Sequence, residues 1–457
     1  MKKHHSNRSM FSGKLGFVLS AAGASVGLGN IWRFPYLAAK YGGGIFLLIY
    51  ILLALTFGYT MIVAETSLGR MTRKSPVGAF ASFTKSHTLK VGGWINAIIP
   101  ILIVPYYSVI GGWVIKYLFE YICGNGTKLA EDGYFSMFIS DGVSAEICFI
   151  VFALITLTII FAGVRNGIER VSKFMMPILV VLSVIIAIYS VTRPGALKGI
   201  QYFLVPNLEN FSWMTVVSAM GQMFYSLSIA MGILVTFGSY MKKETSIENS
   251  TRNVEVFDTA IAIMAGLMII PAVFAFSGGD PNTLQAGPSL MFITIPKVFA
   301  SMGLGTVVGI LFFVLVLFAA VTSSIALTES AVSTFEDELH WNRKKSTVVI
   351  GIIMLALGTL SSLGYGPLDA VKILGMQFLD FFDFLTNSVM MPIAAIATCL
   401  LVSRVIGVDR IEEEMTQEGG TFRRKKIFVM MIKYLCPVFA AIILISSVMN
   451  AFGLISM

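Results

Sequence analysis

Apolar runs long enough to cross a bilayer follow one another along almost the whole chain, and they constrain its fold more than any other feature. A transmembrane helix needs about 20 predominantly apolar residues. About eleven such runs occur, at 14–37, 43–69, 93–122, 144–163, 172–192, 213–240, 254–277, 304–335, 347–365, 374–402 and 427–454. Charged residues make up only 13% of the 457 residues, about half the share of a soluble domain. The sequence therefore predicts an all-α polytopic membrane protein.

The basic residues gather in alternate loops between these runs. Arg70, Arg73 and Lys74 lie in one such loop, Arg165 and Arg170 in the next of this set, and Lys242 and Lys243 in another. The loops of the opposite set hold few Lys or Arg. Because cytoplasmic loops are enriched in Lys and Arg, we expect the N-terminus in the cytoplasm and, with an odd number of spans, the C-terminus outside. This pattern explains the net charge of +8 better than nucleic acid binding does, so no nucleic acid partner is predicted.

The first apolar run contains a glycine-rich stretch, 23–29, that favours a broken helix. Each glycine weakens a helix by about 1 kcal/mol relative to alanine. In a bilayer, backbone that leaves the helix is tolerated only where it lines a cavity or binds something. Free carbonyls at Gly23, Ser25 and Val26 would suit Na⁺, and free amides at Leu28 and Gly29 would attract a carboxylate.

A glycine-rich packing face is the alternative interpretation of this stretch. Asn30 and Arg33 follow it directly, and neither side chain belongs in lipid without a function. These two residues favour a binding site.

The sixth run has a similar interruption over 221–232, with glycines at both ends and Ser226 and Ser228 between them. Serines in apolar helices often bond back to the preceding turn, which is the alternative. The two interrupted runs begin two groups of five, and interruptions at matching positions of two halves indicate a transporter site at an inverted-repeat interface. The expected organisation is a cytoplasmic tail 1–13, a first repeat 14–192, an outer connector 193–212, a second repeat 213–402, a cytoplasmic loop 403–426 and a last helix 427–457.

Other polar residues within the runs are further candidates. Asp258 has no basic residue three or four positions away in its own helix, and Thr322 and Ser323 interrupt the eighth run. Carboxylates inside spans are functional by default, and this also applies to Glu65 and Asp380. Hydroxyl groups are more often packing contacts between helices.

Four segments resemble the neurotransmitter:sodium symporters: "AAGASVGLGNIWRFPY" (21–36), "GGGIFLLIY" (42–50), "GQMFYSLSIAMG" (221–232) and "FAAVTSSIA" (318–326). The similarity runs nearly end to end and is greatest to short bacterial members with eleven spans. It implies a LeuT-type 5+5 inverted repeat with unwound first and sixth helices. It also implies a transporter in the bacterial plasma (inner) membrane that is not an enzyme and needs no obligate protein partner.

The resemblance implies two Na⁺ ions as co-substrates, each held by oxygen ligands as a hard cation requires. The first site would comprise Ser25, Asn30, Ser226, Asp258 and the substrate carboxylate. The second would comprise Gly23, Val26, Ala319, Thr322 and Ser323. The amino acid substrate would contact Ser25, Leu28, Gly29, Ile103, Tyr107, Tyr225, Ser226, Ser228, Met231, Ser323 and Leu327.

The resemblance also implies two gates. Arg33 would pair with Asp383 at the outer gate, with Asp380 as the second candidate, and Arg8 would pair with Asp337 at the inner gate.

The predicted function is sodium-coupled symport of a hydrophobic or aromatic L-amino acid into the cell. The resemblance also implies chloride independence, because Ala262 stands where chloride-dependent members have a chloride-binding serine and Asp258 supplies a fixed negative charge. Proton antiport through Asp258 is an open extension of this hypothesis. The alternative is a channel or sensor on the same scaffold. An intramembrane enzyme is the third and least favoured function, because the sequence shows no metal-ligand cluster and no Ser-His or Cys-His arrangement.

Overall fold

The computed structural model describes residues 9–278 and 287–454, and within them the chain is helical with no named strand. Among the described residues, nine helices are long and apolar enough to cross a membrane. They are Gly44–Thr72 (α3, η2 and α4), His87–Ile122 (α6), Gly142–Phe161 (α9), Val164–Val191 (η3 and α10), Ile247–Ser277 (α14), Gly305–Glu338 (α16), Arg343–Leu363 (α17), Phe378–Ile406 (α18, η7, α19 and η8) and Lys425–Ala451 (α21, η10 and α22).

Two of the predicted spans are broken. The first consists of α1 (Lys14–Ser25) and a second segment, η1 (Gly29–Arg33) with α2 (Phe34–Lys40), which meet at an angle of 55°. The sixth consists of α12 (Trp213–Ser226) and α13 (Ile233–Ser239), and neither piece alone reaches the length of a bilayer. Both breaks lie where glycines and serines interrupt the apolar sequence.

Three segments expected to be loops contain helices. The outer loop 123–143 holds α7 (Gly126–Leu129) and α8 (Tyr134–Ser140), the connector 193–212 holds α11 (Ala196–Leu204), and the cytoplasmic loop 403–426 holds α20 (Val408–Thr416). Each is short and covers an end of the bundle. In α20, Val408, Ile411 and Met415 are buried, and the helix packs on α4. These short amphipathic helices lack the length of a span, so the hydropathy pattern did not separate them from loops.

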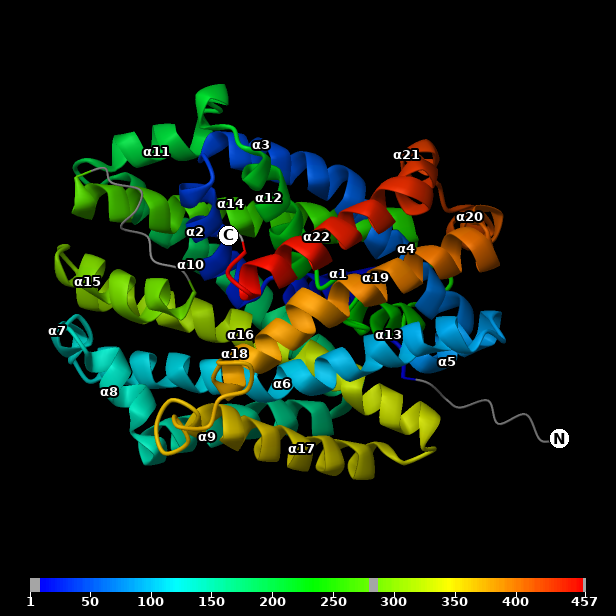
Figure 1. Cartoon of the computed structure of the whole chain (residues 1–457), viewed down its shortest axis with the longest axis horizontal. Coiled ribbons are helices and arrows are strands. Elements are labelled where there is room, and N and C mark those ends of the chain that lie inside the picture. Colours follow the sequence, from blue (N-terminus) through cyan, green and yellow to red (C-terminus); the bar gives the residue numbers. More distant parts are fainter. Residues whose placement is uncertain (1–8, 279–286, 455–457) are drawn as a thin grey trace.

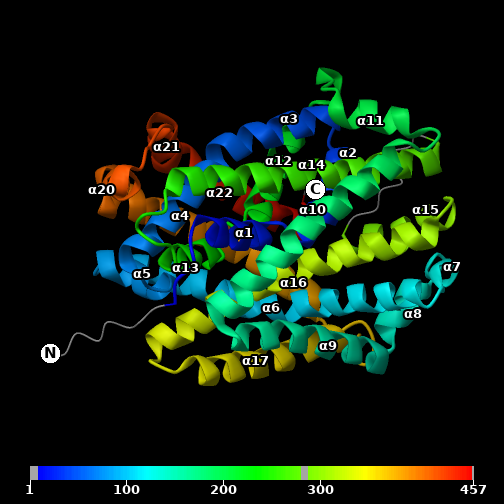
Figure 2. The ribbon, with the colours of Figure 1, turned by 180° about the vertical axis from the view of Figure 1, so that it is seen from behind.

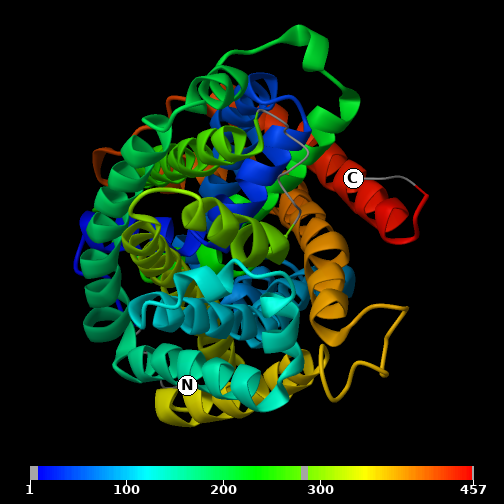
Figure 3. The same ribbon diagram turned by 90° about the vertical axis from the view of Figure 1, so that its left-hand side faces the viewer.

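The long helices run along one common direction, and the two broken helices lie among them. Figure 1 places α5 (Pro76–Phe83), α20 and α21 (Lys425–Met430) at one end of the bundle, and α7, α8 and α15 (Ile295–Ala300) at the opposite end. Figure 2 shows α10 beside α1 from behind, and Figure 3 shows the bundle nearly end on, with the last span (red) at one edge. α1 also contacts α14 and α16, so its break faces other helices rather than lipid.

Candidate functional site

The first break turns backbone carbonyls toward α16. α1 ends at Ser25, and the hydroxyl of Ser323 on α16 lies 3.2 Å from the Gly23 carbonyl oxygen and 3.4 Å from that of Val26. The Thr322 hydroxyl lies 3.1 Å from the Ala319 carbonyl oxygen. The five groups predicted for a second Na⁺ are therefore neighbours, and all of them present oxygen. This donor set fits a hard cation.

The second break is stabilised by a buried carboxylate. Ser228, Ala230 and Gly232 have positive φ angles of 52°, 59° and 70°, so this segment cannot continue the helix. The Ala230 amide donates to Oε1 of Glu65 at 2.8 Å. Glu65 thus satisfies a backbone donor that the break would otherwise leave unpaired in a membrane.

The two breaks contact each other directly. The Ser228 hydroxyl donates to the Ala24 carbonyl oxygen at 3.1 Å, and the Gln222 side-chain amide donates to the Gly29 carbonyl oxygen at 3.1 Å. Residues about 200 positions apart in sequence therefore form one site.

A buried carboxylate lies behind this contact. Asp258 on α14 accepts hydrogen bonds from the Asn30 side-chain amide at 2.8 Å, the Ser226 hydroxyl at 2.9 Å and the Tyr50 hydroxyl at 3.2 Å. The other polar atom of Asn30, Oδ1, is buried and has no partner among the described residues. An unpartnered buried oxygen beside a carboxylate fits a bound cation, so the residues predicted for the first Na⁺ site fit that ion.

Sequence reasoning assigned no role to Tyr50, although it bonds both Asp258 and Ser226. Its only signal was its place at the end of the motif 42–50. The apolar pattern gave no reason to single out this tyrosine.

A cavity of about 30 Å³ lies between the two breaks. Every residue predicted to contact the substrate lines it except Ser226, which lies behind it against Asp258. Ala24, Gly27 and Asn30 also line it, and none of the three had been assigned to the substrate. The cavity holds about one water molecule, so an amino acid enters only if the walls move apart.

The walls are close because two glycines leave room for neighbouring side chains. A Cβ atom added at Gly29 would lie 2.4 Å from the Tyr225 ring, and one added at Gly27 would lie 2.7 Å from the Ser323 hydroxyl oxygen. The Tyr107 hydroxyl is 3.4 Å from the Leu28 amide nitrogen, the predicted carboxylate donor. The glycines are therefore needed for shape as well as for breaking the helix.

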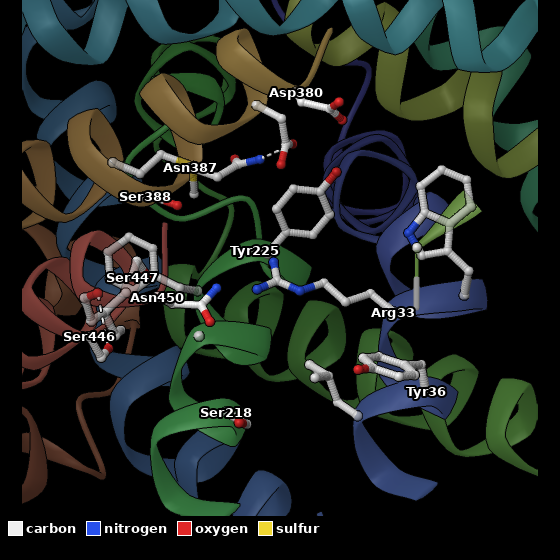
Figure 4. A pocket seen from close by; sticks show the side chains of 18 of the residues that line it. Arg33, Tyr36, Ser218, Tyr225, Asp380, Asn387, Ser388, Ser446, Ser447 and Asn450 are labelled. Carbon is white, nitrogen blue, oxygen red and sulfur yellow. Dashed lines mark hydrogen bonds between the residues drawn. The ribbon is translucent and has the colours of Figure 1, made fainter. Parts of the chain in front are cut away.

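A larger cavity of about 440 Å³ adjoins the small one, and Tyr225 borders both. Figure 4 shows Arg33 next to Tyr225 and Asn450, with Asp380 and Asn387 beyond the Tyr225 ring. The Arg33 guanidinium lies 5.3 Å from the centre of that ring. The Ser446, Ser447 and Asn450 side chains of the last span form a polar wall that the sequence did not predict.

The two residues predicted for the outer gate both line this larger cavity. Asp383 accepts from the Tyr106 hydroxyl at 3.2 Å and the Asn387 amide at 2.6 Å. Among the described residues no ion pair joins Asp383 to Arg33. The Arg33–Asp383 pairing stays a prediction for a state in which the cavity has closed.

The residues around the predicted inner gate make aromatic and polar contacts. The Phe11 amide donates to the Tyr240 carbonyl oxygen at 3.1 Å, and their rings are 6.0 Å apart. Asp337 accepts from the Ser75 amide at 2.6 Å. Arg8, its predicted partner, lies outside the described residues, so the inner pair stays a prediction.

Three comparisons with known proteins agree with this geometry. The model of the sodium:neurotransmitter symporter family matches residues 8–127 and 136–454. The chain is 33% identical to the sodium-dependent transporter YhdH of Bacillus subtilis, over 98% of each chain. It is 27% identical to the human sodium- and chloride-dependent GABA transporter 2, over 90% of this chain and 75% of that protein. The crystal structure of MhsT in complex with L-phenylalanine superposes with a TM-score of 0.86 at 34% identity, covering 96% of this chain and 100% of MhsT.

Proposed function

Because the chain belongs to the sodium:neurotransmitter symporter family, we propose that it couples Na⁺ entry to the uptake of a hydrophobic or aromatic L-amino acid. The predictions of this family and of a LeuT-type fold are confirmed, and the family consists of sodium-dependent transporters. The observation that carries the proposal is the small cavity in which both helix breaks meet.

The walls of this cavity favour a zwitterion with an apolar side chain. In its lining the Leu28 and Gly29 amides and the Tyr107 hydroxyl offer donors to a carboxylate. Ile103, Met231 and Leu327, which also line it, are apolar. None of the described residues that line the cavity carries a charged side chain. A charged substrate side chain would thus lie there without a partner, which is costly.

The L-phenylalanine bound to MhsT supports this choice, because that protein shares 34% of its residues with this chain. Met231 has a flexible, polarizable side chain that can yield to an aromatic ring. Movement of Met231 and Tyr225 would give the cavity the volume that it lacks here.

Two Na⁺ ions are proposed as co-substrates. One would be held at Asn30, Ser226, Asp258 and the Ser25 carbonyl, and the other at Gly23, Val26, Ala319, Thr322 and Ser323. The second group contacts the first break, so an ion there would hold α1 against α16. This contact offers a means for Na⁺ binding to favour one arrangement of the broken helix.

Transport is proposed to be independent of chloride. Two cations and a zwitterion bring net positive charge into a buried site, which is costly unless negative charge lies near. Asp258 would supply that charge, already held by three hydrogen-bond donors. Ala262, one turn further along α14, is buried and offers no side-chain hydrogen bond to an anion. On the return step without Na⁺, Asp258 would bind a proton, which gives H⁺ antiport as an extension of the proposal.

The proposed location is the bacterial inner membrane, with the N-terminus in the cytoplasm and the C-terminus outside. The larger cavity would then open toward the exterior and the Phe11–Tyr240 contact would close the cytoplasmic side. Substrate would enter past Arg33 and Asp383.

The test is a thermal-shift screen of the purified protein against the twenty amino acids, in Na⁺ and in K⁺. A ligand present at 100 times its dissociation constant adds about 2.7 kcal/mol to stability. Stabilisation by Trp, Phe, Tyr, Leu or Met in Na⁺ alone is expected. Stronger stabilisation by glycine, glutamate or lysine would contradict the proposed substrate class.

Uptake into proteoliposomes separates transport from the alternative of a channel. A symporter accumulates the amino acid above its outside concentration when a Na⁺ gradient is imposed, whereas a channel only equilibrates it. Uptake that stops at equal concentrations would contradict the proposal.

A further inference from the structure

Arg404 and Lys433 are exposed cations on two neighbouring helices that are apolar enough to span the membrane. Arg404 belongs to η8 (Leu401–Ile406), at the end of the helix Phe378–Ile406. Lys433 belongs to η10 (Met431–Leu435), within the helix Lys425–Ala451. Both side chains are exposed on the surface of the bundle. A charged group in such a position is costly unless it reaches the headgroups or a partner.

The two cations lie on neighbouring helices at one end of the molecule. α19 (Met391–Leu400) packs against α22 (Cys436–Ala451), and η8 contacts η10. Figures 1 and 2 show these helices leading into α20 and α21 (Lys425–Met430) at the end of the bundle opposite α7, α8 and α15. This is the end with the Lys- and Arg-rich loops, expected to face the cytoplasm.

Two of the basic residues near this pair have acidic partners. Lys425 pairs with Glu412 at 2.5 Å, and Arg424 pairs with Glu255 at 3.1 Å. In the parts of the chain that the structure describes, Arg404 and Lys433 form neither an ion pair nor a side-chain hydrogen bond. The pair thus leaves positive charge at the surface for a partner outside the protein.

Apolar side chains surround the two cations. On η8 and the preceding turn, Leu400 and Val405 are both 40% exposed. On the other helix Met430 is 49% and Tyr434 66% exposed, three and one positions from Lys433. Tyrosine is typical of the boundary between acyl chains and headgroups. We name Arg404, Lys433, Tyr434, Leu400, Val405 and Met430 the Arg404–Lys433 face.

We propose that the Arg404–Lys433 face binds an anionic phospholipid of the cytoplasmic leaflet. The guanidinium and the ammonium would contact the headgroup phosphate, because Arg and Lys both donate charge-assisted hydrogen bonds to phosphate oxygens. The acyl chains would lie along the exposed apolar side chains of α19 and η10. Bound there, the lipid joins the tenth and the last span at their cytoplasmic ends.

The experiment measures lipid binding to the purified full chain by native mass spectrometry, with phosphatidylglycerol, cardiolipin and phosphatidylcholine. A basic residue near an anionic surface contributes a factor of about five in affinity, so the pair is expected to give a preference of about 25-fold for the anionic lipids. The double variant Arg404→Gln/Lys433→Gln should lose most of that preference. Arg404→Lys/Lys433→Arg, which keeps both charges, should retain it.

The matched control removes the same charge elsewhere. Arg165→Gln/Lys344→Gln neutralises two exposed cations of other helices and should leave the lipid preference within about twofold, since neither residue adjoins this face. An equal loss in the control would mean unspecific attraction to a basic surface and would overturn the proposal. So would an unchanged preference in Arg404→Gln/Lys433→Gln. Inorganic phosphate at millimolar concentration should not displace the lipid, and displacement would assign the face to a soluble anion instead.

Discussion

Replacing Asp258 by asparagine tests the central electrostatic argument, because the change removes one charge and almost no volume. The carboxylate accepts hydrogen bonds from Asn30, Ser226 and Tyr50 at 2.8, 2.9 and 3.2 Å. Asparagine keeps one acceptor oxygen but places an NH₂ donor against these donors. Two unit charges about 4 Å apart interact by about 4 kcal/mol at an effective dielectric constant of about 20.

Since about 1.4 kcal/mol corresponds to a tenfold change in affinity, this interaction corresponds to a factor of about 1,000. Part of it is offset because the carboxylate no longer has to be desolvated, so we expect the half-saturating Na⁺ concentration of Asp258→Asn to rise at least about 100-fold. The assay is amino acid uptake into proteoliposomes at increasing Na⁺ concentration and constant ionic strength.

Tyr50→Phe is the matched control. It removes one hydrogen bond to Asp258 and keeps the charge, which predicts a change of about tenfold, given about 1.5 kcal/mol for such a bond. A half-saturating Na⁺ concentration in Asp258→Asn within about threefold of the native value would refute the assignment of this carboxylate to Na⁺. So would equal effects of both variants.

The chloride requirement is measured in the same proteoliposomes with gluconate in place of chloride on both sides. The native protein should keep full activity, because Asp258 already supplies the compensating charge. Loss of uptake when chloride is removed would contradict chloride independence.

Three further changes test the outer cavity and the substrate pocket. Asp383→Asn should lower the transport rate more than equilibrium substrate binding, because the predicted pair with the outer-gate arginine forms only on closure. If Asp383→Asn and Asp380→Asn both transport as fast as the native protein, neither carboxylate is the gate. Met231→Phe should shift the substrate preference from Trp toward Leu in competition uptake, because the phenylalanine ring takes up room among the apolar side chains of the cavity. An unchanged order of preference among the amino acids would contradict the placement of the substrate side chain. Gly29→Ala should reduce substrate affinity at least about tenfold, which corresponds to about 1.4 kcal/mol or more, because the added Cβ would lie 2.4 Å from the Tyr225 ring. Native-like affinity in a thermal-shift titration would show that the ring is free to move.

The sequence by itself determined that the chain is a helical membrane protein with two interrupted spans. Uninterrupted apolar length specifies a span, because backbone polar groups have no water to bond with in the bilayer core. Local composition also located both breaks, since glycine and serine disfavour a continued helix whatever surrounds them. The short helices α7, α8, α11 and α20 were not found, because their burial depends on contacts with the ends of other helices.

The tertiary structure decided how the polar residues meet. Nothing local links Tyr50 to Asp258, and the hydrogen bond exists because α3 and α14 bring residues 208 positions apart into contact. Glu65 was a candidate without a partner in the sequence, and the fold gave it the Ala230 amide of the second break. Arg33 and Asp383, far apart in sequence, likewise line one cavity only because distant helices pack together. The sequence specifies which polar groups need a hydrogen-bond partner in a membrane. The packing of distant helices decides which partner each of them finds.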